Sequence, residues 1–174
     1  MPLKNRVDPF GQFLAVDSRG AWLGNRGILH DSNKEIVSPW KHKAWVTCNL
    51  QFNGWKREVF GQNTYSELFF LDEATALSAG HRPCGTCRKN RFNEFKSVWC
   101  KANINPPSEN EIPIKQIDDQ LHSERAIRGG GKVTFLMKFK EVPAGAFIGV
   151  DENAYLLWDN KLHLWSPDGY SEHS

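Results

Sequence analysis

Residues 68–88 read LFFLDEATALSAGHRPCGTCR, and this stretch contains the clearest local structure signals in the chain. The apolar run over residues 68–71 predicts a short buried strand. Asp72 is a suitable N-cap for a helix over residues 73–79, because its carboxylate can accept a hydrogen bond from a backbone N–H group of the first turn. Gly80 predicts the end of that helix, since glycine readily adopts the left-handed conformation found there. We therefore expect a strand, a helix and then a turn that carries two cysteines.

Cys84 and Cys87 form a Cys-x-x-Cys motif that follows a proline and precedes a second predicted helix. Two thiolates at this spacing can bind one zinc ion, while backbone N–H groups of the turn hydrogen-bond their sulfurs. A redox motif would instead be expected after a strand of a thioredoxin-like unit. Here a predicted helix ending at Gly80 comes first. The pattern therefore favours a metal site over a redox pair or unliganded thiols.

Other residues could complete this site. Cys48 lies on the apolar face of a predicted strand, so it is either an inert core cysteine or a third ligand brought in by the fold. A structural zinc ion needs a fourth ligand, and His81 and His30 are the candidates. Cys100 is excluded, because thirteen helical residues separate it from Cys87, roughly 20 Å at a rise of about 1.5 Å per residue. We expect its thiol on or near the helix surface.

Residues 68–88, with GHRPCGTCR at their end, resemble the second half of the zinc domain of Ada-type DNA methylphosphotriester repair proteins. In that family four cysteines bind zinc, and one zinc-bound thiolate accepts a methyl group from a DNA phosphotriester. The resemblance matches Cys84 and Cys87 to the second ligand pair. The first pair is Cys-x-x-x-Cys in the family, whereas here Cys48 is followed by Phe52 at that spacing. The resemblance therefore implies a structural zinc ion in a DNA-contacting module better than it implies methyl acceptance.

A second resemblance extends over the whole chain. Residues 24–27, 80–84 and 165–167 are similar to segments of a widespread bacterial protein family. This likeness implies a bacterial protein and supplies no function.

The charge of the chain is unevenly distributed. Residues 1–103 carry fifteen Lys and Arg against nine Asp and Glu, whereas residues 104–174 carry seven against eleven, so the net charges are +6 and −4. A basic cluster surrounds the cysteine turn, and it suits phosphate oxygens. Nucleic acid, DNA rather than RNA, is the predicted partner, and a solvated helix face is the alternative. The predicted phosphate contacts are Arg82, Arg88, Lys89, Arg91 and Lys96.

A second constellation suggests a metal-dependent hydrolase or nuclease instead. Asp118 and Asp119 precede His122 by four and three residues on a predicted helix, so a carboxylate could orient the imidazole. Such a histidine can act as a general base or bind a catalytic metal. His30 with Asp31 offers a similar pair, whereas a polar helix face is the alternative. The predicted catalytic residues are His122, Asp119 and Glu124.

The remaining segments predict an α+β fold. Alternation over residues 46–52 predicts a strand, and the turn signal Asn53-Gly54 predicts a hairpin with a returning strand over residues 55–60. Helical spacing predicts helices over residues 86–102 and 114–126. Prolines around residues 105–108 predict a connector, and glycines at 129–131 predict the end of the second of these helices.

The C-terminal part predicts strands. Val133, Phe135, Met137 and Phe139 alternate with polar or basic residues, and three further strand patterns are separated by short turns, at residues 146–150, 154–158 and 161–165. We expect a basic Ada-like zinc-binding part over residues 1–104 and a helix plus β-meander over residues 105–174, packed as one domain. The predicted fold is a single α+β domain with a zinc knuckle, a β-hairpin, two to three helices and a C-terminal antiparallel β-meander.

Composition excludes several classes of protein. The chain has 174 residues, of which 40% are hydrophobic and 24% charged, values typical of globular proteins rather than disordered chains or coiled coils. No apolar run approaches the roughly 18 residues of a membrane span. The N-terminus lacks the apolar core of a secretory signal. We therefore expect a cytoplasmic protein with reduced thiols.

Overall fold

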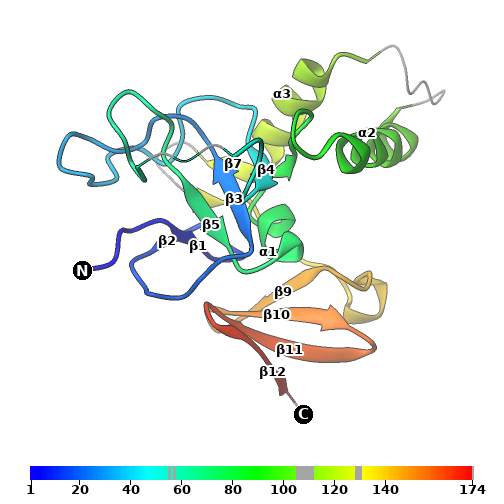
Figure 1. The fold of residues 1–174 in the computed structure, drawn as a ribbon. Helices are drawn as coiled ribbons and strands as arrows, with labels where there is room; N and C mark the ends of the chain where they lie inside the picture. The colour runs from blue at the N-terminus through cyan, green and yellow to red at the C-terminus, as the bar shows by residue number, and fades with distance from the viewer. Residues whose placement is uncertain (55, 57, 105–111, 128–130, 174) are drawn as a thin grey trace.

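The structure, a computed structural model, describes residues 1–54, 56, 58–104, 112–127 and 131–173. Within these residues the fold is α+β, with a six-stranded mixed sheet, three α-helices, a two-stranded ribbon and a C-terminal four-stranded antiparallel sheet (Figure 1). The predicted fold class is confirmed. Two predicted features, the connector at residues 105–108 and most of the 129–131 glycine run, lie outside the described residues.

The six-stranded sheet forms the centre of the molecule. Its strand order is β2-β1-β5-β3-β4-β6, and the pairs β1–β5 and β4–β6 are parallel whereas the others are antiparallel. Neighbouring strands therefore come from distant parts of the chain. The strands are β1 (Arg6–Val7), β2 (Phe13–Leu14), β3 (Trp22–Asn25), β4 (Val46–Asn49), β5 (Leu68–Phe70) and β6 (Arg82–Pro83).

Residues 68–80 fold into the predicted strand and helix. Leu68 and Phe70 of β5 are fully buried and pack in one cluster with Ala76 and Ala79. Helix α1 (Glu73–Ser78) begins after Asp72, whose Oδ1 accepts a hydrogen bond from the Thr75 N–H at 2.7 Å. The helix ends before Gly80, which has a φ of +91°. The buried face of α1 thus fixes where the following cysteine turn begins.

Gly24 explains how β3 fits between β4 and β5. A Cβ atom at this position would lie 2.4 Å from Cε2 of Phe70, far inside van der Waals contact. Gly20 is similarly confined, because its Cβ would lie 2.6 Å from the Phe70 carbonyl oxygen. These glycines are therefore required by close packing against the core.

The hairpin predicted around Asn53-Gly54 is only partly present. Both residues have positive φ, 53° and 68°, so the turn forms. Strand β4 is shorter than predicted, and the described residues after the turn, 56 and 58–60, form no strand, while residues 55 and 57 lie outside the described part. Strand β4 instead pairs with β3 on one edge and β6 on the other. With both edges occupied, no edge of β4 is left for the local partner.

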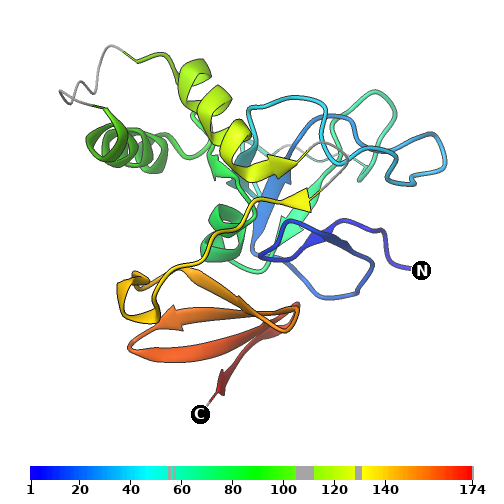
Figure 2. The same ribbon diagram turned by 180° about the vertical axis from the view of Figure 1, so that it is seen from behind.

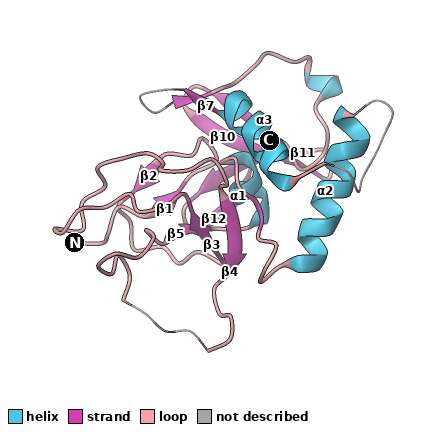
Figure 3. Cartoon of the chain, turned by 90° about the horizontal axis from the view of Figure 1, so that it is seen from above, coloured by secondary structure: helices cyan, strands magenta, loops and turns pink. Residues whose placement is uncertain are grey.

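Helices α2 (Lys89–Asn103) and α3 (Ile114–Arg125) lie at the same end of the molecule (Figures 1 and 3). Both were predicted within a few residues of their observed bounds. The expectation for Cys100 was wrong, because its side chain is 0% exposed rather than at the helix surface. Helix α3 buries Ile117, Asp118 and Arg125, so its charged side chains take part in packing.

The segment after α3 differs in part from the prediction. Residues 133–138 contain no regular structure, so the strand predicted from Val133, Phe135, Met137 and Phe139 is wrong. Alternation produces a strand only beside a partner edge, and this segment instead connects a ribbon to the C-terminal sheet (Figure 2). The ribbon consists of β7 (Ala126–Ile127) and β8 (Gly131–Lys132), and a short 3-10 helix, η1 (Phe139–Glu141), follows the segment.

The predicted meander is confirmed, and a further strand that was not predicted, β12, extends it to a four-stranded sheet with the order β12-β11-β10-β9. It packs beside α1 (Figure 1), where Trp165 Nε1 donates to Thr75 Oγ1 at 3.0 Å and the Tyr170 hydroxyl donates to Asp72 Oδ2 at 2.6 Å. None of the described helices has both the length and the apolar character needed to cross a membrane. The strands are β9 (Phe147–Val150), β10 (Asn153–Trp158), β11 (Lys161–Ser166) and β12 (Gly169–His173).

Candidate metal centre

Three cysteines meet at one edge of the central sheet. The sulfurs of Cys48, Cys84 and Cys87 all lie within 4.8 Å of one another. Across the described part of the chain, this is the one group of at least three His, Cys, Asp or Glu side chains arranged closely enough to hold a metal ion. All three cysteines are half-buried and none is in a disulfide. Of the two possibilities for Cys48, the structure therefore supports the ligand position.

Pairing between β4 and β6 brings these cysteines together. The two strands run parallel with Thr47 opposite Pro83, and the Cys84 N–H donates to the Thr47 carbonyl oxygen at 3.0 Å. Asn49 extends the connection, because its Nδ2 donates to the Cys87 carbonyl oxygen at 2.9 Å. Cys48 lies between these two anchoring residues on β4, so the strand register places its sulfur beside the turn.

The thiols share their protons unevenly. A hydrogen bond from the Cys48 thiol lowers the pKa of Cys84 to about 4, and backbone N–H groups of the turn add to this effect. The same hydrogen bond, together with burial, raises the pKa of Cys48. Burial also raises the pKa of Cys87. The group therefore already favours one thiolate, the form in which cysteine binds metals.

A cavity of about 490 Å³ adjoins the three cysteines. Its walls come from strands β3, β4 and β5, from the cysteine turn and from described residues of the segment between β4 and β5, and they are largely apolar. The three sulfurs therefore lie at the boundary between the sheet and an open space. Its lining includes Leu23, Asn25, Leu50, Phe52, Tyr65, Glu67 and Phe69.

His81, the first candidate for a fourth ligand, lies elsewhere. Its side chain is buried between the rings of Phe70 and Trp45, with centroid distances of 4.6 and 5.5 Å. Its Nε2 accepts a hydrogen bond from Arg26 Nε at 3.1 Å. Burial and the neighbouring arginines lower the pKa of His81 well below its usual value. His81 is therefore a neutral core residue and not a member of the cysteine group.

His30, the second candidate, is also separate from the cysteines. Its Nδ1 lies 2.6 Å from Ser66 Oγ, and its ring stacks on Phe60 with a centroid distance of 4.6 Å. Asp31 does not orient this imidazole. Its Oδ1 instead accepts backbone N–H groups of the next turn, from Asn33 and Glu35. His30 and Asp31 therefore do not act as a pair: His30 packs against Phe60 and Ser66, and Asp31 stabilises the following turn.

Two predicted phosphate contacts are structural instead. Arg82 is 6% exposed, and its Nε and Nη2 donate to the two carboxylate oxygens of Asp118 at 2.6 and 2.8 Å. Arg88 is also buried, with its guanidinium 3.9 Å from the Trp22 ring centroid and in an ion pair with Glu73. The planar guanidinium of Arg88 can stack on the ring and pair with the carboxylate at the same time. These arginines fix the cysteine turn to α3 and α1 rather than face solvent.

The other three predicted contacts lie on α2. Arg91 is partly exposed, and its guanidinium bonds to both Glu73 and Glu94. Those carboxylates raise the pKa of Arg91 and neutralise its charge locally. Lys89 is exposed and Lys96 is half-buried, and neither forms an ion pair within the described residues. The accessible basic surface on α2 is therefore smaller than the sequence predicts.

The residues of the predicted hydrolase site are dispersed. Asp119 binds Lys115 and Lys43, and these hydrogen bonds lower the pKa of Asp119 to about 2. Glu124 accepts a hydrogen bond from Gln120 at 3.0 Å. His122 packs edge-on against two tryptophans, Trp40 and Trp45.

Asp118, the other acid near His122 in sequence, is already bonded to Arg82. Within the described residues, no carboxylate hydrogen-bonds to His122. The helical spacing is correct, but each acid has a nearer basic or amide partner. The structure therefore does not assemble the predicted base.

The cavity walls were missed by sequence reasoning. Leu23 and Phe69 come from β3 and β5, which reach the cysteines only through the order of strands in the sheet. Asn49 was also missed, although its position next to Cys48 would suggest a contact to the turn once β4 and β6 are known to pair. No local pattern in the sequence encodes these contacts.

No family model matches this chain, and neither a curated protein sequence nor a solved structure is detectably similar to it. The function proposed below is therefore inferred from the geometry of the three cysteines and from the resemblance of residues 68–88.

Proposed function

We propose that the protein binds one zinc ion through the thiolates of Cys48, Cys84 and Cys87 and acts in association with nucleic acid, in DNA repair or defence. The observation that carries this proposal is the three-sulfur group. Thiolates are soft ligands that select zinc over hard cations such as Mg²⁺ and Ca²⁺. The Ada-type resemblance of residues 68–88 supports the same metal. A bound zinc ion would tie β4 to the cysteine turn and act as a Lewis acid towards a further ligand.

The adjoining cavity indicates where that further ligand would come from. Structural zinc sites are closed by four protein ligands, whereas catalytic zinc sites have three protein ligands and leave the fourth coordination position to water or substrate. Within the described residues no fourth His, Cys, Asp or Glu side chain joins the group. The cavity beside the sulfurs is large enough for a small ligand. We therefore propose that a water molecule or a ligand in this cavity completes the coordination.

The nucleic-acid part of the proposal is supported by charge. Helix α2 begins two residues after Cys87 and carries the exposed Lys89 and the half-buried Lys96. Residues 1–103, which contain the cysteine group, have a net charge of +6. Lysines on a helix that is fixed to a rigid turn suit contacts with phosphate oxygens. The partner class is DNA or RNA, with DNA favoured by the Ada-type resemblance.

Elemental analysis tests the metal. Protein purified without chelators or affinity metals is expected to contain about one zinc ion per chain, because a single group of cysteines is close enough to bind it. A Cys100→Ala variant should keep this content, since Cys100 lies outside the group. Folded protein that contains no zinc and takes up none when zinc is added would contradict the proposal.

A gel-shift titration tests the partner. The Lys89→Gln/Lys96→Gln variant is expected to bind DNA severalfold more weakly than the unmodified protein at low salt. The dependence of log affinity on log salt should become shallower by about 2, because each lost phosphate contact contributes about 0.9. A Lys138→Gln/Lys140→Gln variant removes the same charge from a distant exposed segment and should bind normally.

The two tests fail independently. If the protein contains zinc but does not change the gel mobility of DNA or RNA, the metal centre is supported and the nucleic-acid partner is contradicted. If the two double variants bind DNA with equal affinity, α2 is not the contact surface.

A further inference from the structure

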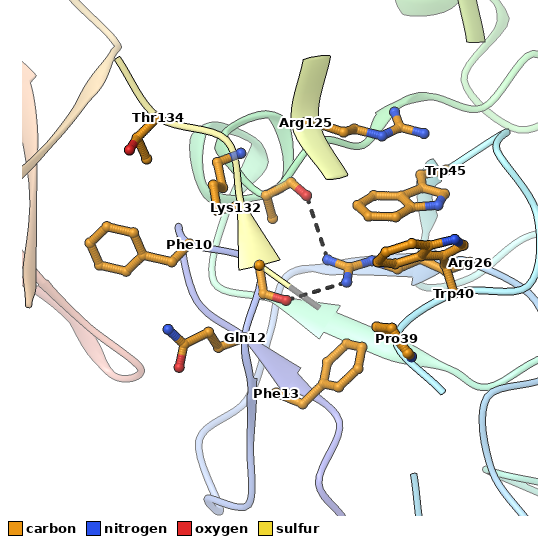
Figure 4. A pocket seen from close by; sticks show the side chains of 13 residues that line it. Phe10, Gln12, Phe13, Arg26, Pro39, Trp40, Trp45, Arg125, Lys132 and Thr134 are labelled. Atoms are coloured by element: carbon orange, nitrogen blue, oxygen red, sulfur yellow. Dashed lines mark hydrogen bonds between the residues drawn. The ribbon is translucent and has the colours of Figure 1, made fainter. Parts of the chain in front are cut away.

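A second cavity, of about 590 Å³, lies apart from the metal centre (Figure 4). It shares no lining residue with the cavity beside the cysteines. Its walls come from residues 10–13, from the segment 39–45 and from the ends of β3, α1 and α3 together with β8. We call it the basic pocket, because its lining includes three cationic side chains, those of Arg26, Arg125 and Lys132.

Arg26 is the most buried of the three cations. Its side chain is 2% exposed, yet none of its hydrogen-bond acceptors carries a charge. Nε donates to His81 Nε2 at 3.1 Å, Nη1 to the Gly11 carbonyl oxygen at 3.3 Å and Nη2 to the Ala79 carbonyl oxygen at 3.5 Å. The two carbonyl contacts, drawn in Figure 4, are long for hydrogen bonds to a guanidinium. A buried arginine normally has a carboxylate or another anion as a partner.

Arg125 and Lys132 also have neutral partners. Arg125, 7% exposed, donates from Nη1 to the Gly80 carbonyl oxygen at 2.6 Å and from Nη2 to the Lys43 carbonyl oxygen. Its buried Nε has no hydrogen-bond partner within the described residues. Lys132 donates to the Ser78 carbonyl oxygen. The pocket therefore gathers three cations around acceptors that carry no charge.

Nearby carboxylates balance this charge only in part. Asp8 interacts electrostatically with Arg26 and Lys132, but its Oδ1 accepts the Gln12 N–H at 2.8 Å and burial raises the pKa of Asp8. Asp118 is attracted to Arg125 but is hydrogen-bonded to Arg82. Three cations therefore share one carboxylate, that of Asp8, and part of a second that is bonded to Arg82. An excess of buried positive charge is costly, so this site is suited to an anion from outside the chain.

Burial acts on all three cations, and repulsion from neighbouring cations adds to it. Both effects lower the pKa of Arg26 to about 9, and burial lowers the pKa of Arg125 to about 10. Burial, Arg26 and Arg125 lower the pKa of Lys132 to about 8. A bound anion would reverse these effects, so protonation and anion binding are linked.

The rest of the lining is aromatic. The ring of Trp45 lies between the guanidinium groups of Arg26 and Arg125, at 4.1 and 4.2 Å from its centroid. Trp40 adjoins Trp45, and Phe10 lies across the pocket from them (Figure 4). The volume is in the range of sites that hold drug-sized ligands, roughly 300–1,000 Å³. The pocket therefore offers both positive charge and flat apolar surface, with more room than an inorganic anion needs.

We propose that the basic pocket binds a nucleotide, with its phosphate on Arg26 and Lys132 and its base against Trp40 and Phe10, while Arg125, on the other side of the Trp45 ring, adds positive charge nearby. A phosphate monoester carries a charge of about −1.5 to −2 at neutral pH, which matches several cations better than a single carboxylate does. Arginine forks suit phosphate oxygens, and bases stack on aromatic side chains. The nucleotide is either free or part of a nucleic-acid strand. The proposal does not depend on the metal centre.

Isothermal titration calorimetry with the full chain tests this proposal. Adenosine 5′-monophosphate is expected to bind, whereas adenosine should not bind and inorganic phosphate should bind more weakly. Lys132→Met keeps most of the side-chain volume and should lower the affinity about tenfold, the effect of one charge-assisted hydrogen bond. Lys140→Met changes an exposed lysine outside the pocket and should leave the affinity unchanged. A parallel titration with a short single-stranded oligonucleotide shows whether the bound nucleotide is free or part of a nucleic-acid strand.

The outcomes separate the alternatives. Binding of the oligonucleotide without the mononucleotide assigns the pocket to a strand. Binding of neither overturns the proposal, as does equal binding of inorganic phosphate or an equal effect of Lys132→Met and Lys140→Met.

The pH dependence provides a measurement on the unmodified protein, in case Lys132→Met does not fold. Lys132 faces Arg26, Arg125, Asp8 and the neutral His81. Since its amine loses charge as the pH rises through about 8, and the phosphate is already ionised above its second pKa of about 6, affinity should fall between about pH 7 and 9. Affinity that stays constant or rises over this interval would contradict the role of Lys132.

Discussion

Replacement of Cys84 by serine is expected to abolish zinc binding and to remove about 4 kcal/mol of stability under saturating zinc, the value for a ligand at about a thousand times its Kd. Cys84 is the residue to replace, because its sulfur contacts both other thiols and its N–H bonds to Thr47 on β4. A serine hydroxyl is a far poorer zinc ligand than a thiolate. Denaturant unfolding with and without a chelator measures this difference.

The chelator separates loss of metal from loss of packing. Cys100→Ala also removes a sulfur, from a side chain that is fully buried outside the group. This variant should be somewhat less stable than the unmodified protein and should still lose stability when chelator is added. Cys84→Ser should be insensitive to chelator. Equal sensitivity of the two variants would show that the metal is bound elsewhere.

Breaking the Arg82–Asp118 pair is expected to have a comparable effect. Arg82→Met leaves the Asp118 carboxylate buried without its partner, and removal of one member of a buried pair destabilises proteins by about 3–5 kcal/mol. Both side chains are less than a tenth exposed, so water cannot replace the guanidinium. The free energy of unfolding from denaturant titration measures the loss. Zinc content should fall as well, because Arg82 lies on β6, the strand that leads directly into Cys84 and holds it in place.

A second substitution distinguishes charge from shape. The Arg82→Met/Asp118→Leu variant removes both charges and should regain much of the lost stability and zinc content, since apolar pairs often replace buried ion pairs without loss. Asp119→Asn serves as the matched control on the same helix, because Asp119 pairs with lysines in solvent and such pairs contribute little. An Arg82→Met protein as stable as the unmodified one would contradict this role.

The sequence predicted those parts of the fold that depend on near neighbours. Asp72 caps α1 and Gly80 ends it as expected, because both act within one helical turn. The meander was also predicted, since its strands pair through short turns with their neighbours in the chain. Cys84 and Cys87 were found by their spacing alone. In each case the interaction that decides the structure joins residues close in sequence.

The remaining features depend on distant residues. Local alternation identified β4 but not its partners β3 and β6, which are separated from it in the chain. Arg82 and Arg88 look like surface charges in the sequence, and only the positions of Asp118 and Glu73 in the fold show that they are buried. Charge patterns state which groups are present but not which are desolvated. The basic pocket was missed for the same reason, since its cations come from three segments that are far apart in the sequence.

The parallel pairing of β4 with β6 also sets the order of events as the chain folds. Cys48 and Cys84 are 36 residues apart, and their sulfurs meet only after that pairing has formed. Closing such a loop costs entropy that is recovered only when the long-range strand contacts are made. A metal ion held by all three cysteines would therefore not nucleate folding through neighbouring ligands alone, as zinc does in small zinc fingers. We expect such an ion to be bound late, by a sheet that is already assembled, so that the rate of metal uptake by a refolding chain would report on completion of that sheet.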